Sequence, residues 1–170
     1  MFNFKKSALA SVLLMGMAVS AGANATSNAT VVWSGVVPTT NASDAMIITG
    51  LAGDTTALYG TITPTTEGVF ESDAIVLESH VNDGDAANPV VGALASANWT
   101  MGETSVTFDG IENPSQAVEV DVNGAPVVFN DVISGVETIS IKVKQTSALP
   151  EAEVGGTTVK ASVTVMADLV

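Results

Sequence analysis

The longest regular pattern of apolar and polar positions in this sequence lies in residues 157–170. Apolar side chains occupy every second position there and polar ones lie between them, with Met166 as the one break in the polar face. Alternation with a period of two, rich in β-branched residues, is typical of a β-strand with one buried face. A strand with such an apolar edge also favours docking of another chain. We expect its inward face to consist of Val159, Ala161, Val163, Val165, Ala167 and Leu169.

Shorter alternating segments, separated by turn residues, fill most of the remaining chain. Asn123-Gly124 is the dipeptide most typical of a two-residue β-hairpin. The secondary structure of residues 89–101 stays undecided, because alanines that tolerate a helical turn lie between strand-forming ends. No segment has convincing helical periodicity. The pattern therefore predicts an all-β protein, an antiparallel sandwich of about nine or ten short strands. We place the further strands at 29–37, 45–49, 57–63, 73–81, 105–108, 117–122, 125–129 and 136–144.

The N-terminal segment has the features of a secretory signal peptide. Lys5 and Lys6 are followed by an uncharged run over 8–23 and by the small residues Ala23-Asn24-Ala25. The run is shorter than the roughly 20 apolar residues that span a bilayer, which disfavours the alternative of a retained membrane anchor. We expect cleavage after Ala25, export of the protein and no insertion into the membrane.

The composition narrows the class of partner. Removal of residues 1–25 leaves three lysines against eighteen acidic residues, a net charge of −15. Such a surface repels phosphate backbones and anionic lipids, so we expect no nucleic-acid binding. Charged residues make up 14% of the chain and apolar residues 46%, which favours a packed core over a disordered acidic segment. Cysteine is absent, so we expect strand pairing and packing to hold the fold without disulfides.

Residues with catalytic or metal-binding chemistry are scarce. His80 is the one histidine and lies at the end of an expected strand, so no triad or multi-histidine metal site can form; we interpret it as a surface or edge histidine. Asn82-Asp83-Gly84-Asp85 offers oxygen atoms to calcium but lacks the spacing of a calcium loop, which favours a solvated turn. We predict no catalytic, cofactor-binding or metal-binding residues, no cofactor and no enzymatic activity.

Both ends of the chain resemble a known family. Residues 26–35 read Thr-Ser-Asn-Ala-Thr-Val-Val-Trp-Ser-Gly, and Ser-Ala-Leu-Pro-Glu at 147–151 precedes a glycine pair and the last alternating segment. In these features, and in its signal peptide and length, the chain is similar to major subunits of chaperone–usher fimbriae (pili), nearest to the cysteine-free alternate and common-pilus pilins. It departs from many of them in lacking a penultimate tyrosine, since its one tyrosine is Tyr59.

The resemblance implies a structural subunit of a surface fimbria that supports cell adhesion or biofilm formation. It implies an immunoglobulin-like sandwich over 38–170 that lacks one strand, with a groove beside the C-terminal strand. A periplasmic chaperone fills this groove first; at the outer-membrane usher, the 26–37 segment of the next subunit replaces it, giving a head-to-tail polymer on the cell surface. The acceptor groove is then the inward face defined above. The implied donor side chains are Ala29, Val31, Trp33, Gly35 and Val37.

Two alternatives remain open at the level of sequence. Trp33 is bulky for a donor side chain and could instead fill the core of its own domain, which would make 29–37 part of a closed sandwich. The protein would then be a monomeric or matrix-associated exported sandwich that binds a carbohydrate or another surface ligand. A type IV pilin fits less well, because no apolar helix follows the expected cleavage site.

Overall fold

The computed structural model describes residues 42–56 and 58–170, and these residues form an almost purely β structure. The helical elements of this part are a 3-10 turn η1 (Leu51–Gly53) and a single turn α1 (Glu151–Val154). The prediction of an all-β fold is thus confirmed. The strands are β1 (Met46–Gly50), β2 (Phe70–Glu71), β3 (Ile75–Asn82), β4 (Val91–Leu94), β5 (Ala97–Phe108), β6 (Val118–Val122), β7 (Ala125–Val127), β8 (Val132–Val136), β9 (Thr138–Gln145) and β10 (Val159–Leu169).

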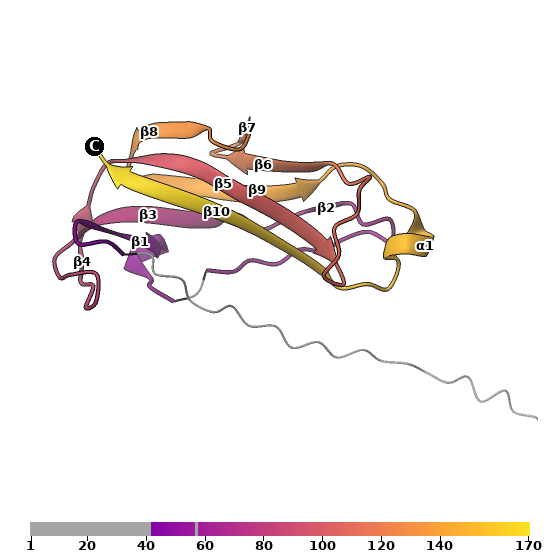
Figure 1. Cartoon of the computed structure of the whole chain (residues 1–170), viewed down its shortest axis with the longest axis horizontal. Coiled ribbons are helices and arrows are strands. Elements are labelled where there is room, and N and C mark those ends of the chain that lie inside the picture. Colours follow the sequence, from indigo (N-terminus) through magenta and orange to yellow (C-terminus); the bar gives the residue numbers. More distant parts are fainter. Residues whose placement is uncertain (1–41, 57) are drawn as a thin grey trace, which may run out of the picture. The chain divides into compact units, whose positions relative to one another are not determined.

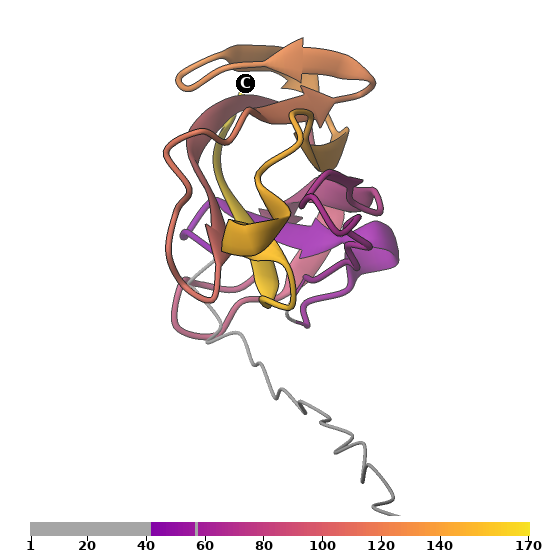
Figure 2. The ribbon, with the colours of Figure 1, turned by 90° about the vertical axis from the view of Figure 1, so that its right-hand side faces the viewer.

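The strands form two antiparallel sheets. The larger sheet has the order β1-β3-β9-β6-β7, with β2 pairing to β9 and β4 pairing to β3. The smaller sheet has the order β10-β5-β8. In Figure 1, β10 and β5 cross in front of β3 and β9, with β1 and the C-terminus at one end and α1 at the other. Figure 2 looks along the strands from the α1 end.

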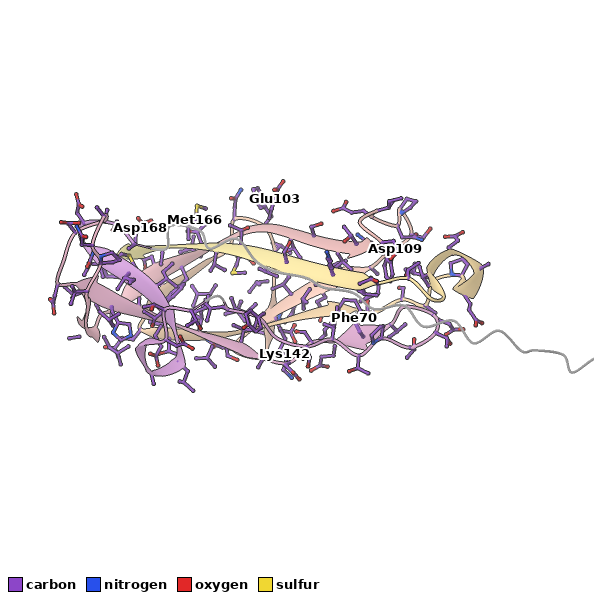
Figure 3. All side chains as sticks on the ribbon, turned by 90° about the horizontal axis from the view of Figure 1, so that it is seen from below. Phe70, Glu103, Asp109, Lys142, Met166 and Asp168 are labelled. Carbon is purple, nitrogen blue, oxygen red and sulfur yellow. The ribbon has the colours of Figure 1, made fainter. Side chains whose placement is uncertain are left out.

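One hydrophobic cluster lies between the two sheets. Trp99 at its centre is fully buried, and its indole Nε1–H donates to the Val136 carbonyl oxygen at 3.0 Å, which joins β5 to β8. Figure 3 shows Phe70 on the inner side, while Met166 and Glu103 on one sheet and Lys142 on the other point away from the core. The buried members of the cluster come from both sheets: Met46, Phe70, Leu77, Ala97, Trp99, Met101, Val106, Phe108, Val120, Val122, Ile139, Ile141, Val143, Leu149 and Val154.

A β-bulge in β5 explains how this strand keeps its apolar side chains inward. Met101 and Val106 are five positions apart, an odd number, so an unbroken alternation would turn one of them toward solvent. In the structure Val163 pairs with Thr104 and Val165 with Met101, so two residues of β5 lie opposite one residue of β10. Ala97, Trp99 and Met101 therefore face inward before the bulge, and Val106 and Phe108 after it.

The expected hairpin is present. Asn123 and Gly124 both have positive φ, 53° and 81°, and connect β6 to β7 as the two-residue turn requires. The strands expected near 45–49, 73–81, 105–108, 117–122 and 136–144 are confirmed within a few residues at each end. The segment 105–108, however, is only the end of β5, which begins in the undecided region at Ala97.

Two expected strands need correction. Of the described residues in 57–63, only Ile62 makes a strand-like contact, an isolated bridge to Ser72, so the expected strand is wrong. Gly60 and the following Pro64 explain this, because neither residue type favours a continuous strand. The strand expected over 125–129 ends at Val127, and Phe129 beyond it is 65% exposed.

Candidate functional site

Among the described residues, the strand β10 has a partner on one of its two edges. It pairs with β5 over its whole length, and no other described residue pairs with it. Figure 1 shows it as the front strand of the smaller sheet. An unpaired strand edge presents a row of free N–H and C=O groups that can template the addition of another strand. The open edge of β10 is therefore the candidate site.

The pattern of hydrogen bonds between β10 and β5 determines which residues of β10 direct their N–H and C=O groups to the open edge. The Val170 N–H donates to the Ser96 carbonyl at 3.1 Å, and the Asp109 N–H donates to the Thr158 carbonyl at 2.9 Å. Even-numbered residues of the terminal strand thus bond to β5 on both sides of the bulge, since bonding alternates along an antiparallel pair. The odd-numbered residues direct their backbone groups to the open edge. They are the six predicted from sequence: Val159, Ala161, Val163, Val165, Ala167 and Leu169.

The side chains of the same six residues are incompletely covered. Five of them are half-buried and pack against the core, and Leu169 is 37% exposed. On the adjacent strand the inward side chains are covered far better: Ala97, Trp99 and Val106 are fully buried, and Phe108 is 5% exposed. At its start, over residues 97–100, β5 also pairs with β8 on its other edge, whereas no described strand pairs with the other edge of β10. The result is an apolar strip along the open edge.

A pocket of about 660 Å³ lies at the Val159 end of this strip. Phe108, Val154 and Val159 supply apolar walls, and Gly155 and Gly156 border the opening. Gly68 also lines it, and a Cβ at this residue would lie 3.0 Å from the Phe108 ring, so the glycine lets the loop approach the ring closely. No sequence motif identifies this pocket, because loops far apart in the sequence form it.

The candidate site carries no ionisable side chain on its inward face. Lys160 and Asp168 of the same strand are exposed and alternate with the inward residues. Ion pairs lie instead on the outer face of the larger sheet, where Lys142 contacts Glu71 at 2.6 Å and Lys144 contacts Asp121. The hydrogen bond and charge of Lys142 hold the pKa of Glu71 below its usual range. The open edge therefore offers backbone hydrogen-bonding groups and apolar surface rather than charge.

The predicted donor residues Ala29, Val31, Trp33, Gly35 and Val37 lie outside the described residues, as does the segment expected to be a signal peptide. Of the residues predicted for this site, the structure therefore describes only the six of β10. Within the described part of the chain, no helix is long and apolar enough to cross a membrane. The same residues contain no group of three His, Cys, Asp or Glu side chains placed to hold a metal ion.

The expectation of a surface histidine at position 80 is wrong. His80 is 7% exposed, since η1 and the segment leading into β4 contact the polar side chains on this face of β3. The sequence carries no signal of this burial, because the alternation of Glu78, His80 and Asn82 with Leu77 marks a polar face, which is ordinarily exposed.

A comparison of the sequence with protein-family models found no match. A search of curated proteins found no match either.

Proposed function

We propose that this chain is the structural subunit of a surface fimbria assembled by donor-strand exchange, and that the fimbria supports adhesion or biofilm formation. The observation that carries the proposal is the open edge of β10, where free backbone groups and half-covered apolar side chains occur on the same residues. This combination suits β-strand addition, in which the backbone supplies affinity and alternate side chains fill pockets.

The proposed fold is an immunoglobulin-like sandwich that lacks one strand. Two sheets sharing one core support it, and the strip beside β10 is where the additional strand would lie. In the proposed cycle residues 1–25 direct export, and a periplasmic chaperone covers the strip. The segment 26–37 of another copy then displaces the chaperone at an outer-membrane usher. Its inward side chains would be Ala29, Val31, Trp33, Gly35 and Val37.

The direction of the added strand decides whether its source is the same copy or another. Ala42 bridges to Ile47, which pairs with His80 on β3. The preceding residue of that strand, Ser79, accepts a hydrogen bond from the Ala95 N–H, and the Ser96 carbonyl beside Ala95 accepts one from the Val170 N–H. Through this chain of contacts, Ala42 lies at the same end of the molecule as the end of β10, as β1 does in Figure 1.

The length of the connecting segment then limits what one copy can do. Five residues reach at most about 17 Å, whereas β10 extends about 33 Å from Leu169 to Val159. A segment antiparallel to β10 with Val37 opposite Val159 would place Val37 roughly twice too far from its own Ala42. Only another copy can supply this strand, and the contact is then head-to-tail and gives a filament. A strand parallel to β10 would instead lie within reach of its own chain.

We favour the antiparallel arrangement because all strand pairs of the described residues are antiparallel and this pairing is the more stable one. With Val37 opposite Val159, Trp33 lies opposite Val163 and Ala29 opposite Ala167, so the donor covers nearly the whole strip. Val37 then enters the pocket beside Phe108.

Engineered cysteines test this alignment without background, because the chain has no cysteine. Ser34→Cys with Ser162→Cys places two outward side chains directly opposite each other in the antiparallel arrangement, in a pair close enough for a disulfide. We expect an intermolecular disulfide ladder on a non-reducing gel. The matched control is Ser34→Cys with Thr164→Cys, which are opposite in the parallel arrangement. An intramolecular disulfide in the control alone would support a closed single copy and contradict the proposal.

A proline pair tests which donor residues bond to β10. Because odd-numbered residues present the open edge, odd-numbered donor residues use their own N–H in an antiparallel pair. Val31→Pro removes such a donor and is expected to abolish polymers. Val32→Pro, whose N–H points away from β10, is expected to retain them. Equal polymer yields from the two variants would contradict the alignment.

Polymer formation itself is measured on material sheared from the cell surface. On a denaturing gel, unheated samples are expected to show a ladder that collapses to one monomer band on boiling. Monomer in both lanes, from abundant exported protein, would overturn the proposed function. A heat-sensitive ladder without the expected disulfide would overturn only the alignment.

A further inference from the structure

A column of polar side chains lies buried on the outer face of β3. Its members are Glu78, His80 and Asn82, every second residue of β3, on the face away from Leu77. They are 8%, 7% and 6% exposed. They contact η1, the loop that leads into β4, and β4 itself at Gly92. Buried polar groups require partners, so their contacts indicate what the column does.

Asn82 joins three segments through its side-chain amide. Its Nδ2–H donates to the Ser43 carbonyl at 2.7 Å, and its Oδ1 accepts from the Gly84 and Val90 N–H groups at 3.0 and 2.9 Å. All of these bonds are neutral and do not change with pH. This end of the column is therefore a fixed connection.

His80 differs, because both of its ring nitrogens face acceptors. Nδ1 lies 2.9 Å from the Gly92 carbonyl oxygen, and Nε2 lies 3.3 Å from Glu78 Oε2. The same carboxylate oxygen accepts the Gly53 N–H at 3.1 Å. A carbonyl and a carboxylate can only accept, so both contacts are hydrogen bonds only when the ring carries two protons. A neutral ring leaves one lone pair facing an acceptor.

We propose that His80 is a proton-operated latch: uptake of one proton completes a hydrogen-bonded chain from Gly92 on β4 through His80 and Glu78 to Gly53 in η1. The latch fastens the segments on both sides of β3 to that strand. It is closed while the ring carries both protons and opens when the ring loses one of them. The inference stands independently of the proposed fimbrial function.

The other ionisable groups near the ring are acidic. Burial opposes ionisation of Glu78, but the N–H groups of Ala52 and Gly53 and the contact with His80 outweigh it, so the pKa of this carboxyl is lowered. It therefore remains an acceptor while the ring takes up its proton. The surrounding segments contain no lysine. Their ionisable groups are all acidic: Asp44 before β1, Asp54 after η1, Asp83 and Asp85 in the segment before β4, and Glu137 before β9.

The latch can be observed directly, because the chain contains one histidine and its ring signals have no overlap. Ring nitrogen NMR shifts of the labelled full-length chain would be followed between about pH 4 and pH 9, a range that brackets the imidazole titration. Amide exchange at Gly53 and over 91–94 would be measured in parallel and corrected for intrinsic rates. We expect both ring nitrogens to be protonated in acid, and protection of Gly53 to fall about tenfold or more as the ring deprotonates.

Glu78→Gln is the informative variant. In the place of Oε2, its amide oxygen still accepts the Gly53 N–H and a ring Nε2–H, but the side chain has no charge that favours the second ring proton. We expect the pH dependence at Gly53 to disappear while the variant stays folded. Asp85→Asn, in the segment leading into β4 but not bonded to the ring, is the matched control and should keep the dependence.

Two results would overturn the latch. One is protection of Gly53 that does not follow the ring titration in the unmodified chain. The other is uptake of the second ring proton in acid without any change in the amide-exchange protection of Gly53 or of residues 91–94. Both are read from the unmodified protein, so the test remains decisive if the Glu78 variant fails to fold.

Discussion

Deletion of Glu103 tests whether the bulge in β5 exists only to correct the phase of its apolar side chains. Gly102 and Glu103 lie opposite the single residue Thr164. Removing Glu103 leaves one residue opposite one, so Met101 and Val106 still face inward and the ladder becomes regular. Glu103 is exposed and points away from the core in Figure 3, so little else is lost.

The matched control is deletion of Thr107, which shortens the same strand by one residue beyond the bulge. This deletion turns Phe108 from the core toward solvent, or moves Val106 outward if the bulge is removed instead. Phe108 is 5% exposed, and loss of a buried phenylalanine from a core costs about 3 to 5 kcal/mol. We expect the Glu103 deletion to change the free energy of unfolding by less than about 1 kcal/mol, as for a surface position.

Urea unfolding monitored by tryptophan fluorescence measures both deletions, since Trp99 lies in the core. The slopes with denaturant should remain similar, while the midpoint of the Thr107 deletion falls strongly. A Glu103 deletion as destabilising as the Thr107 deletion would refute the phase argument, because the bulge would then contribute contacts of its own.

Three further perturbations test other parts of the fold. Trp99→Phe leaves the Val136 carbonyl without its indole donor and a void beside it, so denaturant unfolding should show a loss of about 2 to 4 kcal/mol. Gly124→Ala places a Cβ at φ 81° in the hairpin turn and should cost about 1 kcal/mol without a change in core packing, measured as a lower melting temperature. Lys142 lowers the pKa of Glu71, so this ion pair stabilises the fold when the carboxyl is ionised, and that stabilisation is lost as the pH falls and the carboxyl is protonated. Lys142→Met should therefore weaken the pH dependence of the melting temperature between about pH 5 and pH 3.

Much of the strand content could be predicted from local pattern. The alternation in β10, β9 and β3 and the Asn123-Gly124 turn depend on the period of side-chain direction and on local φ preference, which operate within a few residues. The length of β5 could not be predicted in this way. Its phase changes at the bulge, so its two halves resemble separate short segments unless the partner strand is known.

Only part of the candidate site could likewise be predicted from the sequence. The inward residues of β10 are visible in the sequence because alternation fixes the face of each side chain. The openness of the edge is not visible, because it depends on which strands pair with β10 and which do not. The pocket beside Phe108 and the burial of His80 likewise depend on loops brought together from distant positions, such as Gly68 with Val154 and Gly53 with Gly92.

The coincidence of free backbone and uncovered side chains on β10 has a consequence for how any partner is recognised. Along a strand, side chains alternate between faces while N–H and C=O groups alternate between edges, so all inward residues share one edge. Here that edge is the open one, because the even-numbered residues bond to β5. An incoming antiparallel strand therefore forms its hydrogen bonds through the residues whose side chains enter the core. Alignment errors of one residue would lose both kinds of contact together, which makes the apolar strip selective for register as well as for an extended chain.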